Sequence, residues 1–207
     1  FLKTLEEPLT RTTIIITSAH REKLLPTIIS RCQQFYFDPL KKEEIKKYLM
    51  FKYNKNETDA NLIATMSQGS IVKACDYLDD NINKMRNNIV DILRISLKRK
   101  NYRNNLIDSI EDIIKQKDKK LNTLVLELLL IWLRDVYYIS KTQNTNDVVN
   151  IDMLNRMILF CEGFKNVDYI KALNKIEKAI IKLNQNIDPF LVYIALFIEL
   201  RQVFLIK

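Results

Sequence analysis

Residues 121–139 read LNTLVLELLLIWLRDVYYI, a long and strongly apolar stretch of this 207-residue chain. Their length approaches that of a membrane span, but Glu127, Arg134 and Asp135 would be costly in hydrocarbon. We therefore predict the central helix of a bundle over residues 121–140. The whole sequence has two glycines and four prolines, which leaves little material for β-hairpins. The fold is predicted to be mainly α-helical.

Further long amphipathic helices are expected around this central one. Their lengths and polar joints are typical of a helical bundle. At the start of the last helix, Asp188 is suited to the N-cap and Pro189 to the first helical position. The linker over residues 141–150 is polar and rich in Asn and Thr. The expected long helices span residues 83–98, 102–115, 121–140, 151–164, 167–184 and 189–204.

Three short helices are expected upstream of the bundle. The first covers residues 41–52, with apolar side chains on one stripe at three-to-four spacing. The second covers residues 58–67 and is broken by Gly69. The third begins after Ser70, a good N-cap.

The first forty residues carry the only strand signals. The β-branched run over residues 12–17 predicts a strand buried on both faces of a parallel sheet. A short helix follows at residues 24–29, with Pro26 in its first turn, and then a second short strand at 33–37. Arg31 lies between that helix and the second strand. An arginine fixed there, with small neighbours, can project its donors beyond its own domain, and phosphate is their natural target.

Two linked motifs in this region resemble the clamp-loader subunits of bacterial DNA polymerase III, which are AAA+ proteins. The motifs are LKTLEEP at residues 2–8 and KLLPTIISRCQ at residues 23–33. The second contains the family's Ser-Arg-Cys motif at Ser30, Arg31 and Cys32. The resemblance implies that Arg31 is an arginine finger that acts in trans on the γ-phosphate of ATP bound to the next subunit. An isolated Ser-Arg-Cys would favour an arginine that caps a helix C-terminus, and the surrounding match reverses that order.

The same resemblance implies three parts of the chain. Residues 1–38 would be the C-terminal end of an AAA+ α/β base, residues 39–80 a three-helix lid, and residues 81–207 a helical collar for oligomerisation. The segments 132–135 and 186–189 resemble recurring collar segments. Because Phe1 opens what looks like a helix ending at Pro8 and is not an initiator methionine, we expect the C-terminal part of a longer protein.

One departure from the family pattern bears on mechanism. Residues 69–78 resemble the sensor-2 region, but Val72 stands at the register of the arginine found in the ATP-hydrolysing gamma/tau subunits. Lys73 is the nearest cation, and one residue along a helix turns it by roughly 100° from that face. The chain therefore resembles the delta-prime type, which offers an arginine finger without hydrolysing ATP. Thr17 and Ser18 lie where the family has its sensor-1 polar residue.

The resemblance implies a delta-prime-like subunit that helps to load the sliding clamp on primed DNA. Its partners would be the gamma/tau and delta subunits, without membrane association. ATP-Mg would be bound by a neighbouring subunit, since these residues contain no glycine-rich phosphate loop. No catalytic constellation emerges, and the single histidine, His20, is expected in a loop. The alternatives are a gamma/tau ATPase motor subunit and, from another class, a free-standing basic helical module that binds nucleic acid.

The formal charge of +8 is compatible with nucleic-acid binding, but its distribution weakens that interpretation. The basic clusters are mostly interleaved with Asp, Glu and Asn, which favours solvated helix faces. They lie at residues 41–42, 46–47, 98–100 and 115–120.

Cys32, Cys75 and Cys161 are far apart, without the spacing of a zinc site or a disulfide framework. No secretory signal or lipidation motif is visible, which leads us to expect a cytoplasmic protein.

Overall fold

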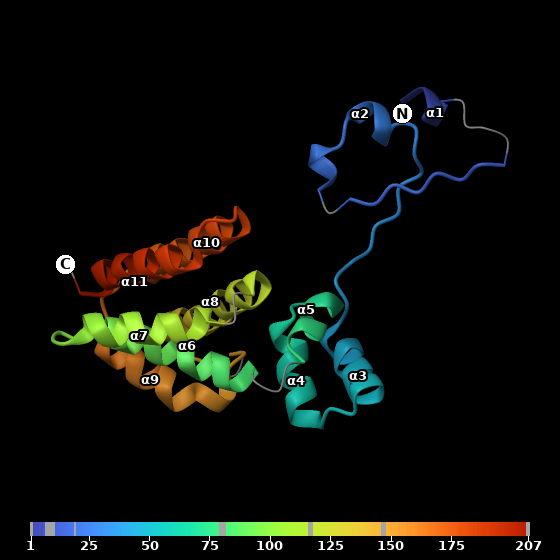
Figure 1. Cartoon of the computed structure of the whole chain (residues 1–207). Helices are drawn as coiled ribbons and strands as arrows, with labels where there is room; N and C mark the ends of the chain where they lie inside the picture. The colour runs from blue at the N-terminus through green and yellow to red at the C-terminus, as the bar shows by residue number, and fades with distance from the viewer. Residues whose placement is uncertain are drawn as a thin grey trace. The chain divides into compact units, whose positions relative to one another are not determined.

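The computed structural model describes residues 2–6, 11–18, 20–78, 82–115, 118–145 and 148–205 (Figure 1). The chain divides into two compact units, Phe1–Pro39 and Leu40–Lys207. The boundary between the two units lies one residue after the boundary at residue 38 that the sequence led us to expect. The second expected boundary, at residue 80, lies outside the described residues. The described part is helical, and the predicted mainly-α class is confirmed.

The first unit holds α1 (Leu2–Glu6), a 3-10 turn η1 (Arg21–Lys23) and α2 (Pro26–Ile29). Figure 1 shows α1 beside α2. The expected end of the first helix at Pro8 falls outside the described residues. None of the described residues of this unit is buried.

The two predicted strands, at residues 12–17 and 33–37, are wrong for the described residues. Both segments are irregular, and neither forms a ladder with another described segment. A β-branched run has the propensity for a strand, but a strand exists only where a second one pairs with its backbone. The apolar side chains expected inside a sheet are instead exposed: Ile15 by 82% and Phe37 by 95%.

The second unit begins with the three expected short helices: α3 (Lys42–Tyr53), α4 (Glu57–Met66) and α5 (Ile71–Asp76). Gly69, in the turn between α4 and α5, has a φ of 86°, a left-handed conformation that glycine adopts easily. Ser70 caps α5 as predicted, because its side chain accepts a hydrogen bond from the Lys73 N–H.

The longer helices follow in the predicted order, with ends that differ from prediction by up to three residues. The largest difference is at α9, where a 3-10 turn, η2 (Ile151–Met153), takes the place of its first turn. Asp188 accepts a hydrogen bond from the Leu191 N–H over 3.1 Å and so caps the last helix, as expected. The helices are α6 (Ile82–Ser96), α7 (Tyr102–Ile114), α8 (Lys119–Thr142), α9 (Leu154–Gly163), α10 (Tyr169–Asn184) and α11 (Pro189–Leu205).

The central helix predicted from residues 121–139 is α8, which packs against α6, α9 and α10. Trp132 is 1% exposed and meets the ring of Phe160 edge-on, with 5.2 Å between ring centroids. Another face of α8 carries Leu124, Leu128 and Ile131, which close the hydrophobic cluster of the three short helices. No helix in the described part of the chain is long and apolar enough to cross a membrane.

The buried charge on α8 is Asp135, which is 5% exposed. Its carboxylate accepts three hydrogen bonds from the loop before α9: from the Val149 N–H over 3.2 Å, the Asn150 N–H over 2.8 Å and the Asn150 Nδ2 over 2.7 Å. Burial raises the pKa of Asp135, and the hydrogen bonds from Asn150 oppose that rise. The loop is thereby fastened to the middle of the bundle.

Arg86 of α6 completes this network from the other side. It is 2% exposed and donates from Nη1 to Asn150 Oδ1 over 3.0 Å. Its guanidinium also forms an ion pair with Asp152 and a hydrogen bond to Asn83. The chain from Asp135 through Asn150 to Arg86 therefore joins α8, the loop before α9 and α6.

Replacement of Asp135 should be one of the most destabilising single changes in the second unit. In Asp135→Ala, three donors lose their acceptor, and we expect the free energy of unfolding to fall by about 3 kcal/mol. Urea unfolding followed by circular dichroism measures it. Asp108→Ala, at an exposed position of α7, is the control and should change stability by less than about 0.5 kcal/mol. Equal stability of the two variants would contradict the role given to the network.

Candidate functional site

Arg31 follows directly after α2, whose geometry the sequence sets locally. Pro26 occupies the first helical position, where its missing N–H costs no hydrogen bond. The helix is a single turn, and the Ser30 N–H closes it by donating to the Pro26 carbonyl over 2.9 Å. Arg31 is therefore placed just beyond the C-terminus of α2.

The guanidinium of Arg31 binds local acceptors on both helices of the first unit. Its Nη1 donates to the Thr27 carbonyl over 2.9 Å and to Ser30 Oγ over 3.4 Å. Its Nη2 forms an ion pair with the carboxylate of Glu6 at the end of α1. The Arg31 side chain is 35% exposed and that of Glu6 49%. In this structure Arg31 caps α2 and holds α1 to it, while part of the fork faces solvent.

The other predicted residues of the first unit lie around this turn or on the segment before it. Ser30 donates from Oγ to the Thr27 carbonyl over 3.2 Å, and Cys32 is half-buried. Thr17 and Ser18 are exposed on an irregular segment, where Ser18 Oγ accepts a hydrogen bond from the His20 N–H over 3.1 Å. The structure brings Ser30 and Arg31 together, and it gives Thr17 no contact with them among the described interactions.

The predicted sensor-2 position belongs to the second unit. Val72 is 66% exposed on α5. The ammonium group of Lys73 lies 3.2 Å from a carboxylate oxygen of Glu127 on α8. Lys73 therefore links α5 to the central helix.

A cavity of about 660 Å³ lies beside this ion pair, between α5 and the start of α8. Its lysines have partners: Lys73 binds Glu127, Lys120 binds Asp76 over 2.6 Å, and Lys119 donates to Asn186 Oδ1 over 2.6 Å. Three carboxylates, of Asp76, Asp118 and Glu127, line the cavity together with these three lysines, so its formal charges balance. In the part of the chain that the structure describes, no group of three His, Cys, Asp or Glu side chains is arranged to hold a metal ion.

Sequence reasoning missed two partners in these networks. Glu6 lies within the first motif, and nothing in that motif indicates that it pairs with Arg31. Arg86 could have been found, because it occupies the apolar stripe of α6 with Ile82, Ile89 and Leu93. A cation at a stripe position indicates a buried, paired charge.

Comparison with known proteins points to one family. The family model described as "DNA polymerase III, delta subunit" matches residues 1–41, the stretch that contains both quoted motifs. The chain is 28% identical over 164 residues to DNA polymerase III subunit gamma of Buchnera aphidicola subsp. Acyrthosiphon pisum (strain APS), covering 69% of this chain and 44% of that protein. It is 29% identical over 140 residues to DNA polymerase III subunit delta' of Bacillus subtilis (strain 168), covering 67% of this chain and 42% of that protein.

These matches support the resemblance to clamp-loader subunits of DNA polymerase III that the motifs indicate. The chain spans less than half the length of the two relatives. Both a gamma and a delta' subunit match at nearly the same identity, so the subunit type has to be argued from the residues of the site.

The 207 residues alone are expected not to bind ATP-Mg with micromolar affinity. Neither of the two glycines, Gly69 and Gly163, is part of a phosphate-loop motif, and Val72 offers no donor. Isothermal titration calorimetry with ATP-Mg is the measurement, with an intact gamma subunit as the positive control. A clear micromolar binding isotherm from this chain would contradict the expectation.

Proposed function

We propose that the chain is part of a delta-prime-like subunit that helps to load the sliding clamp on primed DNA. In this proposal Arg31 acts in trans on the γ-phosphate of ATP-Mg bound to a neighbouring gamma/tau subunit. The observation that carries it is the Ser30-Arg31-Cys32 motif within the stretch that the family model matches. The partial exposure of the Arg31 side chain is compatible with a target outside the chain.

The delta-prime type is supported by the environment of α5. Val72 stands where a gamma/tau subunit would have its sensor-2 arginine. Its side chain is exposed. Lys73 is engaged with Glu127. A subunit with this surface would contribute an arginine to ATP hydrolysis without a complete site of its own.

The alternative is a gamma/tau ATPase motor subunit. The gamma relative from Buchnera, at 28% identity, favours it as much as the delta' relative favours the first proposal. The two differ in whether the complete coding sequence contains a phosphate loop upstream of these residues. Nucleotide binding by the full-length protein would select the gamma/tau type.

Arg31→Ala in the full-length subunit should leave folding and complex assembly nearly intact and lower ATP hydrolysis. An arginine finger in trans can be worth about 10³ to 10⁵ in rate. Only the adjacent ATP site of a multi-site loader loses it, so we expect a partial drop in the total ATPase rate. Arg31→Lys should rescue poorly, since an ammonium group cannot reproduce the fork.

The measurement is DNA-stimulated ATP hydrolysis and clamp loading by the reconstituted complex. Arg11→Ala, which removes another exposed arginine of the same unit, is the matched control and should behave as wild type. If Arg31→Ala supports both activities at the wild-type rate, Arg31 only fastens α1 to α2.

Assembly with other subunits is supported by the outer face of α11. Leu191, Ile198 and Leu205 are 61%, 46% and 37% exposed and recur every seven residues, which places them on one stripe. The opposite face of α11 is buried in the bundle. A helix with a second apolar stripe at heptad spacing is suited to pack against a helix of another collar.

The double variant Leu191→Lys/Ile198→Lys should therefore stop co-elution of this chain with a gamma/tau collar in size-exclusion chromatography. Leu159→Lys on α9 removes an aliphatic side chain that is 68% exposed and should leave co-elution intact. Loss of co-elution in both variants, or in neither, would show that the α11 stripe is not the contact.

A further inference from the structure

The structure separates the basic clusters of this chain into two kinds. Cations in two of them, at residues 46–47 and 115–120, are paired with acidic groups: Lys46 lies 2.8 Å from Glu57, Lys120 lies 2.6 Å from Asp76, and Lys115 pairs with Asp112. These positions behave as the solvated, neutralised helix faces expected from the sequence.

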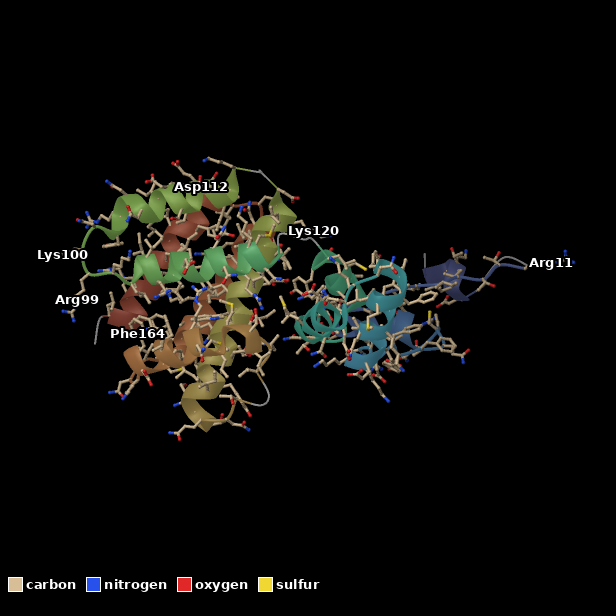
Figure 2. The ribbon with its side chains drawn as sticks, turned by 90° about the horizontal axis from the view of Figure 1, so that it is seen from below. Arg11, Arg99, Lys100, Asp112, Lys120 and Phe164 are labelled. Carbon is tan, nitrogen blue, oxygen red and sulfur yellow. The ribbon has the colours of Figure 1, made fainter. Side chains whose placement is uncertain are left out.

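The cluster at the connection between α6 and α7 has a different environment. Residues 92–107 contain no Asp or Glu, whereas Lys98, Arg99, Lys100 and Arg103 follow one another within six positions. All four side chains are exposed, and none forms an ion pair with another described residue. We call these four residues the basic tip. Figure 2 shows Arg99 and Lys100 at the end of the helical bundle, directed away from it.

Arg201 of α11 holds the backbone of the basic tip by hydrogen bonds. Its Nη1 donates to the Ser96 and Lys98 carbonyl groups, each over 2.6 Å. The guanidinium carbon also lies 3.9 Å from the centroid of the Tyr102 ring. Ser96 is fully buried, so the tip stands on the rigid core rather than on a loose loop. Arg201 holds the backbone of the tip, and the four cationic side chains of the tip face solvent.

We propose that the basic tip binds the phosphate backbone of duplex DNA. Unpaired Lys and Arg side chains are the groups that displace counterions from nucleic-acid phosphates. Tyr102 is the only aromatic residue in residues 97–103, and Arg201 covers it, which leaves no ring on which an unpaired base could stack. Duplex is therefore favoured over single strands.

A lipid surface fits the basic tip less well. Membrane-surface binding needs apolar side chains next to the cations. Leu97 and Leu106, the nearest aliphatic residues on either side of the tip, are both buried, and Ile107 beyond them is 37% exposed. The proposal goes beyond the proposed function, because it involves neither Arg31 nor ATP, and it is tested on the 207-residue chain without other subunits.

The test is fluorescence anisotropy with a labelled DNA duplex of roughly 20 base pairs, at several salt concentrations between about 50 and 200 mM. The triple variant Lys98→Ala/Arg99→Ala/Lys100→Ala should bind at least about tenfold more weakly at the lowest salt. The slope of log affinity against log salt should fall in magnitude by about 2.7, because each lost phosphate contact removes about 0.9.

The matched control is Lys84→Ala/Lys178→Ala/Lys182→Ala, which removes three exposed cations from α6 and α10. It should keep the wild-type slope and affinity. Arg99→Glu/Lys100→Glu, which changes only two exposed side chains, should abolish binding and decides the matter if the triple variant does not fold. Equal losses in the triple variant and the control, tighter binding of single strands than of duplex, or binding to anionic vesicles but not to DNA would each overturn the proposal.

Discussion

The fold of residues 40–207 depends on the burial of one helix, α8, from more than one side. Leu124, Leu128 and Ile131 close the cluster of the short helices α3, α4 and α5, while Leu129 and Trp132 belong to the core of the long helices. A helix that is apolar nearly all round must be covered all round. Each fully buried aliphatic side chain contributes about 1.5–3 kcal/mol relative to exposure. The short and long helices are therefore held in one unit because both sets pack against α8.

The three charged residues that argued against a membrane span each have a defined place around α8. Arg134 is exposed, Glu127 binds Lys73 of α5, and Asp135 is buried under three hydrogen bonds. Two of these charges connect α8 to other elements. Glu127 and Asp135 thus help to determine which segment packs against which face of α8, because apolar contacts alone specify such an arrangement poorly.

The helices were predictable because their signals are local: periodic apolar residues, the caps at Ser70 and Asp188, and the break at Gly69. The two strands were predicted wrongly, because strand propensity is a local property and does not tell whether another segment pairs with the backbone. The candidate site divides in the same way. The position of Arg31 after α2 follows from Pro26 and the adjacent motif, whereas its pairing with Glu6 joins residues 25 positions apart and leaves no local signal.

The contacts of Arg31 in this structure bear on how an arginine could serve a neighbour. Both members of its ion pair with Glu6 are partly exposed, and such surface pairs contribute only about 0–1 kcal/mol. A polyphosphate carries more charge than one carboxylate and can accept two parallel hydrogen bonds from the guanidinium fork. Exchange of Glu6 for a phosphate would therefore cost this chain little, while the bond to the Thr27 carbonyl could keep the side chain in place. If Arg31 acts in trans as proposed, weak and replaceable partners beside a hydrogen-bonded turn would preorganise it for an external anion.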